Sequence, residues 1–143
     1  MDVIIRPYEV KDAVTLTSLM IGEFGYKESN AQQLIMRLRR FQVHPDYHTL
    51  VALDQREVIG FIGIHKGMSY EFDEEYIKIN ALAVKSSYQN SEVGNKLLED
   101  VEAYARKRNI HRIVVEDEGL KDTCQFYKDR GYEVKGCSFI KRI

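Results

Sequence analysis

The sequence predicts a mixed α/β domain whose elements follow the order β-α-α-β-β-β-α-β-α-β. Short runs of β-branched and aromatic residues alternate with longer segments in which apolar residues recur every three or four positions. Only two prolines and no low-complexity stretch interrupt the 143 residues, so nothing marks a linker. We therefore expect one domain over residues 1–143, long enough to bury a hydrophobic core.

The amino-terminal third is expected to hold one strand and two helices. Residues 2–6 are rich in β-branched side chains, and this strand ends at Pro7, whose ring removes a backbone donor. Residues 11–23 and 30–41 carry their apolar side chains mostly on one helical face. Both segments are therefore predicted to be amphipathic helices.

The middle of the chain predicts three strands. Residues 48–54 and 58–70 carry alternating apolar side chains on either side of a turn at 55–57, which is the pattern of a β-hairpin. Residues 76–84 supply the third strand. One face of this strand is expected to carry Ile77, Ile79, Ala81 and Ala83.

The last third begins with the clearest helix of the chain. Its apolar stripe recurs at helical spacing and consists of Val93, Leu97, Leu98, Val101, Tyr104 and Ala105. Residues 111–116 are predicted to form a short buried strand, and residues 122–130 a short helix that ends at Gly131, a residue suited to a left-handed cap. Residues 138–143 are predicted to form a closing strand.

Composition argues against several classes of protein. The net charge is −1, from 21 basic and 22 acidic residues, so we expect neither nucleic acid nor an anionic membrane as a partner. Cys124 and Cys137 form no CxxC motif and no zinc-like cluster with the four histidines, which indicates neither a disulfide framework nor a metal site. Without a signal peptide or a long apolar run, the sequence predicts a soluble protein of the reducing cytoplasm.

A polar turn with a single glycine, Gly94, joins the strand at 76–84 to the helix that follows. The start of a helix gathers free backbone N–H groups and the positive end of the helix dipole, so this junction is a general cradle for an anion. It is neither a Walker A loop, because no Gly-Lys-Ser/Thr ends it, nor a GxGxxG fingerprint. The alternative is that Gly94 only eases close packing of the helix against the strand.

The residues around this junction carry a family resemblance. "INALAVKSSYQNSEVGNKLLEDVEAYARKR", followed by "IVVE" and "CQFYKDRGYEV", resembles the GNAT superfamily of acetyl-CoA-dependent N-acetyltransferases, and "IIRPYEVKD" and "VIGFIGI" extend the likeness over the whole chain. The resemblance implies a mostly antiparallel central sheet flanked by helices. It also implies direct transfer of an acetyl group from acetyl-CoA to a primary amine of a small molecule, peptide or protein, and the family allows a homodimer.

The resemblance assigns a cofactor site position by position. The family's loop usually reads Gln/Arg-x-x-Gly-x-Gly/Ala, and Gln89, Val93 and Gly94 match its Gln or Arg, its Ile or Val, and its last Gly or Ala. The implied loop residues are Gln89, Asn90, Ser91, Glu92, Val93, Gly94, Asn95 and Lys96. The backbone of Leu82, Ala83 and Val84 would pair with the pantetheine arm like an added strand, which requires the next strand to splay away and a bulge within 79–84.

Glu92 departs from the family pattern. It replaces the first glycine of the loop and brings a negative charge close to the expected diphosphate, and Asn90 replaces another common glycine. Glu92 must therefore turn outward or weaken cofactor binding. Two compensations are open: the carboxylate serves the helix dipole while its own N–H faces the phosphates, or Lys96 supplies a countercharge.

By the same resemblance, Tyr127 would protonate the departing thiolate, because a phenol stays protonated at neutral pH, and the N–H of Val84 would stabilise the oxyanion. The alternative for Tyr127 is a core aromatic residue beside Phe126. The general base stays unassigned: the strand position sometimes used by the family falls near Lys78, which cannot act as a base. Further candidates, each of which can equally be a solvated or packing residue, are His65, Glu71, Glu74 and Glu75.

Several other residues can be interpreted either as structural or solvated residues or as functional ones. Cys124 is expected to be a packing residue rather than an acyl-carrying nucleophile, and Lys121 and Lys128 either contact the adenosine phosphates or are solvated. The acidic segment 65–76 would lie on the acceptor side and favour a cationic amine. The alternative function is a non-catalytic CoA-sensing or protein-interaction module on the same fold, with Glu92 marking a decayed loop.

Overall fold

The protein is described by a computed structural model that covers residues 2–89, 91–116, 121–136 and 138–143, with the backbone alone described at residues 121–123. Its strands are β1 (Val3–Pro7), β2 (Tyr47–Asp54), β3 (Glu57–Gly67), β4 (Tyr76–Val84) and β5 (Ile113–Val115). Its helices are α1 (Ala13–Phe24), α2 (Ala31–Val43), α3 (Val93–Lys107) and α4 (Lys121–Lys128), with the short 3-10 turns Val10–Asp12, Glu28–Asn30 and Ser86–Tyr88.

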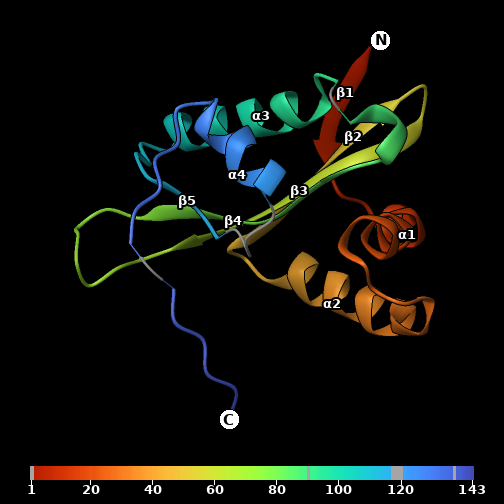
Figure 1. The fold of residues 1–143 in the computed structure, drawn as a ribbon, viewed down its shortest axis with the longest axis horizontal. Helices are drawn as coiled ribbons and strands as arrows, with labels where there is room; N and C mark the ends of the chain where they lie inside the picture. Colours follow the sequence, from red (N-terminus) through yellow and green to blue (C-terminus); the bar gives the residue numbers. More distant parts are fainter. Residues whose placement is uncertain (1, 90, 117–120, 137) are drawn as a thin grey trace.

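The five strands form one mixed sheet in the order β1-β2-β3-β4-β5. Neighbouring strands are antiparallel from β1 to β4, and only β4 and β5 run parallel. The parallel pair is joined by α3, as a parallel connection requires a crossover. The mostly antiparallel sheet flanked by helices confirms the predicted fold class (Figure 1).

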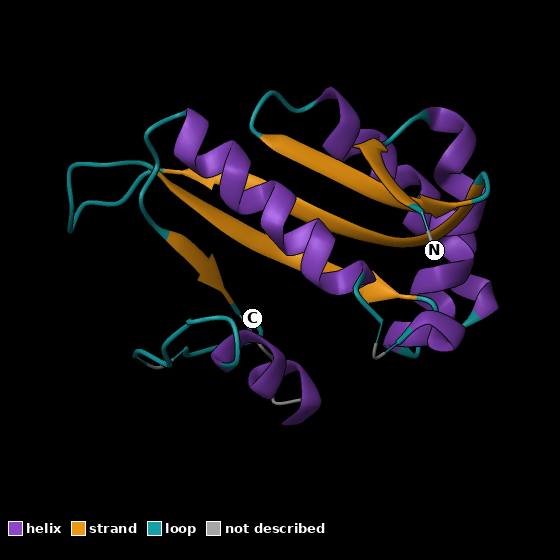
Figure 2. Cartoon of the chain, turned by 90° about the horizontal axis from the view of Figure 1, so that it is seen from above, coloured by secondary structure: helices purple, strands orange, loops and turns teal. Residues whose placement is uncertain are grey.

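The sheet carries a separate apolar cluster on each face. On one face α3 packs through the predicted stripe, whose residues Val93, Leu97 and Val101 are fully buried against Ile62 and Ile77. On the other face α1 and α2 bury Leu16 and Leu34 against Val51 and Phe61. Figure 2 shows α3 lying across its face of the sheet, and Figure 1 shows α4 on the same side as α3.

A β-bulge at Asn80 changes which face the second half of β4 presents. Gly63 pairs with Ala81 and Ile64 with Ile79, so Asn80 is an extra residue opposite β3. Ile77 and Ile79 therefore belong to the α3 cluster, whereas Ala83 is buried in the α1–α2 cluster and Ala81 packs against it. The prediction of a bulge within 79–84 is confirmed, and the prediction of one continuous apolar face is wrong, because an extra residue reverses the alternation.

The closing strand predicted over residues 138–143 is not formed. Phe139, Ile140 and Ile143 are exposed, and Figure 1 shows the carboxyl-terminal residues running away from the sheet. A strand needs a partner edge for its backbone hydrogen bonds, and β5 is only three residues long. The apolar pattern of this segment was thus insufficient to place it in the sheet.

The remaining helix predictions agree closely with the structure. The helix predicted over 122–130 is α4, and Gly131 follows it in the left-handed region with φ of 89°. None of the described helices combines the length and the hydrophobicity needed to cross a lipid bilayer.

Candidate active site

The carboxyl-terminal half of β4 has an open hydrogen-bonding edge. β5 pairs only with residues 77–79, and the two strands diverge beyond that point (Figure 2). Lys85 N–H donates to the carbonyl of Ile59 in β3 at 2.7 Å. Because successive residues of a strand direct their backbone N–H and C=O groups alternately toward and away from the neighbouring strand, those of Leu82 and Val84 point away from β3. Ala83 lies between them with its groups facing β3. The structure therefore presents Leu82 and Val84 on the splayed side.

Gln89 is held at the opening of this edge by two acceptors. Its Nε2 donates to Glu23 Oε2 at 2.8 Å and to the Val84 carbonyl at 3.3 Å. Glu23, near the end of α1, also accepts a hydrogen bond from Ser86 Oγ at 2.7 Å. This arrangement, which we call the Glu23 clasp, ties α1 to the turn that follows β4.

The turn between β4 and α3 is braced at two further points. Tyr88 donates its phenol proton to Asp54 at 2.8 Å, a hydrogen bond that raises the pKa of Tyr88 and keeps it protonated. Ser91 Oγ bonds the Tyr88 carbonyl and accepts the Val93 N–H at 3.4 Å. Asn90, which was assigned to the cofactor site, lies outside the described residues.

The first turn of α3 directs backbone donors into the same region. First-turn amides have no acceptor inside their own helix. Val93 uses Ser91 Oγ, but within the described residues the amides of Gly94 and Asn95 have no hydrogen-bond acceptor. These two N–H groups, at the positive end of the helix dipole, are thus available for an anion.

Glu92 is the residue before the first turn of α3, and its side chain leans along the helix. Its carboxylate is 3.5 Å from Lys96 Nζ, and both side chains are partly exposed. The carboxylate is therefore turned outward and Lys96 is its countercharge, which was one of the two expected compensations, while Glu92 makes no side-chain capping hydrogen bond at the start of the helix. The charge of Glu92 nevertheless stays within one turn of the free amides.

Gly94 has a packing role as well. A Cβ atom at this position would lie 3.3 Å from Phe126 Cε2, so the missing side chain lets α4 approach α3 closely. Arg130 covers the other part of this contact: its guanidinium lies 3.7 Å from the Phe126 ring centre and its Nε donates to Asn95 Oδ1 at 2.8 Å. A positive charge is thereby fixed at the start of α3.

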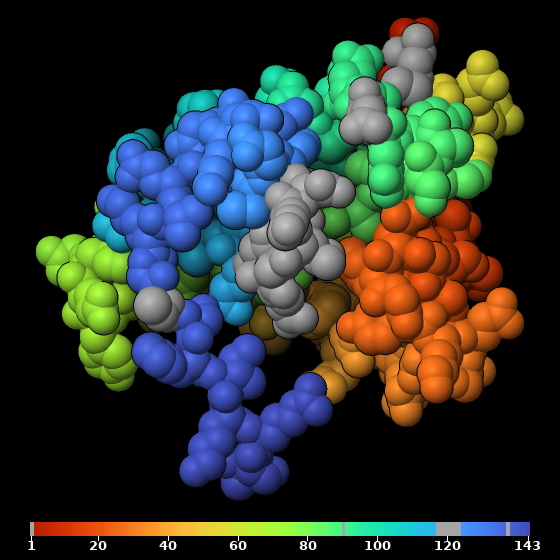
Figure 3. Space-filling view, viewed as in Figure 1, coloured from red at the N-terminus to blue at the C-terminus, as the bar shows by residue number. Residues whose placement is uncertain are grey.

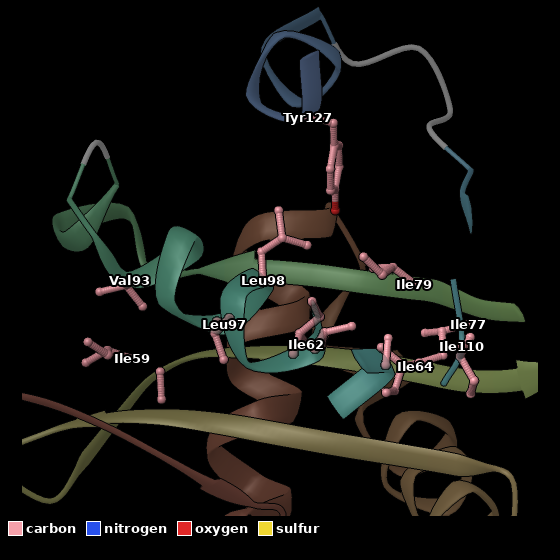
Figure 4. Packing of buried hydrophobic residues seen from close by; sticks show 13 residues of the cluster. Ile59, Ile62, Ile64, Ile77, Ile79, Val93, Leu97, Leu98, Ile110 and Tyr127 are labelled. Atoms are coloured by element: carbon pink, nitrogen blue, oxygen red, sulfur yellow. The ribbon is translucent and has the colours of Figure 1, made fainter. Parts of the chain in front are cut away.

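Tyr127 is both a packing residue and a residue of the cleft. Its ring contacts Phe126 and Tyr132 edge-on at centroid distances of 5.2 and 5.4 Å, and only 6% of the residue is exposed. Figure 4 shows the side chain pointing from α4 toward the sheet, with the hydroxyl at the end nearest the strands. The two interpretations of Tyr127 are therefore compatible, since burial of the ring directs the hydroxyl.

A cleft of about 680 Å³ opens in front of this hydroxyl, next to β4. α1 and α2 form one wall, residues from β2, β3 and β4 form the floor, and Val115, Glu116 and Tyr127 lie on the other side. Figure 3 shows α1 and α2 in orange on one side of this face and α4 in blue on the other. Leu82 and Asn80 also line the cleft, which places the bulge of β4 inside it.

The charged groups near the reaction position differ from those that the sequence suggested. Lys78 lines the cleft and forms an ion pair with Glu116 at 3.0 Å. The base candidates Glu71, Glu74 and Glu75 are not in the lining. His65 lies just behind it, where its Nδ1 is within 3.1 Å of the amide of Asn80 and its ring stacks on Tyr47.

Other expected residues lie elsewhere. No residue of the acidic segment 65–76 lines the cleft, so its charge gives no support for a cationic acceptor. Cys124 is a free, half-buried thiol, and Lys128 is exposed at the end of α4; the side chain of Lys121 and all of Cys137 lie outside the described residues. Among the described residues, no group of three or more histidines, cysteines and carboxylates is placed to hold a metal ion.

Glu23, Glu116 and Arg130 are site residues that sequence reasoning missed. Glu23 and Gln89 are 66 positions apart, and Asn95 and Arg130 are 35 apart. No local pattern connects such pairs. Glu116 alone carried a signal, because it directly follows a short strand whose parallel neighbour leads into the cofactor-type loop.

Solved structures share this architecture over the whole chain. A GNAT family acetyltransferase from Staphylococcus aureus is 27% identical, with a TM-score of 0.80 and full coverage of both chains. An aminoglycoside antibiotic 6'-N-acetyltransferase from Acinetobacter baumannii is 14% identical, with a TM-score of 0.82 and 99% coverage of each chain. A transcriptional regulator from Bacillus halodurans is 15% identical, with a TM-score of 0.86 and coverage of 99% of this chain and 100% of that one.

At the level of sequence, none of the curated proteins matches the chain significantly. The profile of the Acetyltransferase (GNAT) family, in contrast, matches residues 14–132, a range that runs from α1 to the residue after Gly131. Because that match spans most of the sequence and includes β4, the turn and α3, the chain belongs to the GNAT family of acetyltransferases.

Proposed function

We propose that this protein transfers an acetyl group directly from acetyl-CoA to a primary amine, as a single domain over residues 1–143 in the cytoplasm. The observation that carries the proposal is the open edge of β4 beside the free amides of α3. Leu82 and Val84 offer backbone donors and acceptors on the splayed side, and Gly94 and Asn95 offer N–H groups at the next helix. An extended amide chain that ends in a diphosphate matches this sequence of groups.

The residues present fit acetyl-CoA at two places where it needs polar contacts, the pantetheine arm and the diphosphate. The pantetheine amides would pair with Leu82 and the carbonyl of Val84 as an added strand would, which leaves the Val84 N–H for the reacting carbonyl. The diphosphate would be bound by the amides of Gly94 and Asn95, with Arg130 and Lys96 supplying positive charge. Bound acetyl-CoA supplies the activated acyl group, and no metal is required.

Three groups of this chain would serve the transfer. The Val84 N–H would stabilise the oxyanion, and the Tyr127 hydroxyl would give its proton to the departing thiolate. Glu116 would accept the proton from the attacking amine. Glu23 is the other carboxylate among the described lining residues; it accepts hydrogen bonds from both Ser86 and Gln89, whereas Glu116 has Lys78 as its partner.

Calorimetry with acetyl-CoA and a thiol-release assay with diverse amines test the proposal. We expect saturable cofactor binding and release of free CoA that depends on an amine. Absence of binding at millimolar acetyl-CoA would refute the cofactor site. Binding without thiol release from any amine would favour a second function, a CoA-sensing module, for which the structural likeness to a transcriptional regulator is the supporting observation.

A further inference from the structure

We propose that the acceptor is a small primary amine that carries a carboxylate on an apolar or aromatic body, and that Arg37 binds this carboxylate. The inference rests on the proposed acetyl transfer and names the class of acceptor. It depends on one residue of α2 and on the charges that surround it in the cleft.

Arg37 occupies the face of α2 that is turned toward the cleft. Leu34 and Leu38 on this face are buried, and Arg37 lies between them in sequence and lines the cleft with them and with Phe41. Arg40, on the same helix, does not line the cleft. Arg37 is thus an exposed residue at the edge of the apolar stripe, where the helical repeat places it at the rim of the cleft.

Of the charged side chains described in the cleft, Arg37 is the one that has no counterion. The charged side chains in the lining are Glu23, Arg37, Lys78 and Glu116. Glu23 is held in its clasp by Ser86 and Gln89, and Lys78 and Glu116 pair with each other at 3.0 Å. Arg37 has no ion pair or hydrogen bond with any described residue. Among the residues that the structure describes, the cleft thus presents one unpaired positive charge.

The walls of the cleft select an apolar body. Phe24 packs edge-on against Tyr26 and Phe61 at 6.4 and 6.3 Å, and all three rings line the cleft. Phe41 and Tyr47 stack at 4.9 Å on the side of α2. An acceptor placed among these rings gains from burial of an apolar surface. Among the described residues of the lining, a polycation such as an aminoglycoside would find two carboxylates, Glu23 and Glu116, which are both already engaged, and Arg37 would repel it.

The two ends of such an acceptor match opposite charges. The Arg37 guanidinium offers a planar pair of donors suited to a carboxylate, and it comes from α2. Glu116 comes from the end of β5 near Tyr127, where a single ammonium group would share it with Lys78 or replace Lys78 as its partner. An amine with a carboxylate, in the manner of an amino acid with an apolar side chain, would therefore be oriented with its nitrogen toward the thioester.

Matched pairs of amines that differ only in the carboxylate provide the test. We expect kcat/KM for phenylalanine and leucine to exceed that for phenethylamine and isoamylamine by about tenfold or more, the range of one charge-assisted contact. Arg37→Gln should abolish this preference by lowering kcat/KM for the two amino acids to the level of the matching plain amines. Arg40→Gln, on the same helix outside the cleft, is the matched control and should retain the preference.

A binding measurement keeps the inference testable apart from catalysis. 3-Phenylpropanoate has the carboxylate and the ring but no amine, and we expect it to bind the protein and to lose affinity by about tenfold in Arg37→Gln. Equal rates within each pair, or release of CoA only with spermidine or an aminoglycoside, would overturn the inference and leave acetyl transfer intact. If no amine is acetylated, the proposal of acetyl transfer is refuted. If 3-phenylpropanoate does not bind, or binds equally well to Arg37→Gln, the inference about Arg37 is refuted.

Discussion

Tyr127 shows how one side chain combines packing with chemistry. Its ring completes an aromatic row between Phe126 and Tyr132, and that packing directs the hydroxyl toward the sheet (Figure 4). The neighbour Tyr132 differs, because its hydroxyl donates to Glu102 at 3.1 Å and burial raises its pKa. Two adjacent phenols thus have different surroundings, and only Tyr127 lines the cleft.

Replacing Tyr127 by Phe tests the role of the hydroxyl. The ring stays in place, so the fold and acetyl-CoA affinity should be retained, while kcat falls by about 100-fold because the thiolate loses its proton donor. Steady-state kinetics with one acceptor and calorimetry with acetyl-CoA measure the two effects. Tyr132→Phe is the control, and we expect its kcat to stay near that of the unmodified protein. An unchanged kcat in Tyr127→Phe would remove the assignment.

Asp12 is a second residue whose environment has a measurable consequence. Its carboxylate is buried, accepts hydrogen bonds from Arg6 at 2.7 and 2.9 Å and also accepts the Glu9 N–H at 2.8 Å. The hydrogen bonds from Arg6 lower the pKa of Asp12 below its ordinary value. The ion pair between Asp12, which directly precedes α1, and Arg6 of β1 therefore connects these two elements.

The stability that Asp12 contributes should depend on pH. A carboxyl whose pKa is lower in the folded state stabilises the fold above its unfolded pKa of about 3.9, and the contribution is lost as the pH falls through the folded pKa. Asp12→Asn should lower the free energy of unfolding by about 2 kcal/mol at pH 7. Urea unfolding at several pH values should show this difference shrinking below about pH 4. The exposed residue Asp100, replaced by Asn, should show no such pattern.

At the scale of elements, the functional region is built from the end of β4, the turn and the start of α3. The bulge at Asn80 reverses the faces of β4, and the short pairing with β5 leaves residues 82–84 with an open edge. The Glu23 clasp and the Tyr88–Asp54 hydrogen bond then fix the turn from two other elements, α1 and β2. The first turn of α3 is held in position by its neighbours.

Changing Glu92 tests how the charge of this turn affects the cofactor. Glu92→Gln and Glu92→Gly should each tighten acetyl-CoA binding by a few fold, because a negative charge near the diphosphate is removed. The pairing with Lys96 already reduces that repulsion, so a larger gain is not expected. Calorimetry at low and high salt should show the gain shrinking with ionic strength. Weaker binding in both variants, with Asp100→Asn unchanged, would mean that the carboxylate helps the cofactor.

For the whole molecule, the carboxyl-terminal segment is the part that the sheet does not include. Residues 138–143 form no strand, and their apolar side chains are exposed. The two apolar clusters, one under α3 and one under α1 and α2, do not contain them. Stability should therefore come from the sheet and the helices on its two faces, without this segment.

Deleting residues 138–143 tests this description. We expect a change in unfolding free energy below about 0.5 kcal/mol, as for other exposed positions, and hence a shift in Tm of less than about 2 °C. Ile77→Ala, at a fully buried residue near the start of β4, is the comparison and should cost about 2–5 kcal/mol. A loss of stability on deletion that approached the loss in Ile77→Ala would show that the segment belongs to the sheet.

Local patterns in the sequence determined the elements and the loop between β4 and α3. Apolar periodicity places α3, and β-branched alternation places β4, because these signals lie within neighbouring residues. The family match followed from the same short stretches around Gln89 and Gly94. The bulge was predicted too, although its effect on Ala81 and Ala83 was not.

Only the tertiary structure decided which charges meet in the cleft. The ion pair of Lys78 with Glu116, the clasp between Glu23 and Gln89, and the unpaired Arg37 each depend on segments that are distant in sequence. The same holds for the closing segment, whose alternation suggested a strand but which lacks a partner edge. The periodicity of apolar residues indicates which side of a helix or strand is buried. Which charged groups or strand edges pair depends on the distant segments that the fold brings to that side.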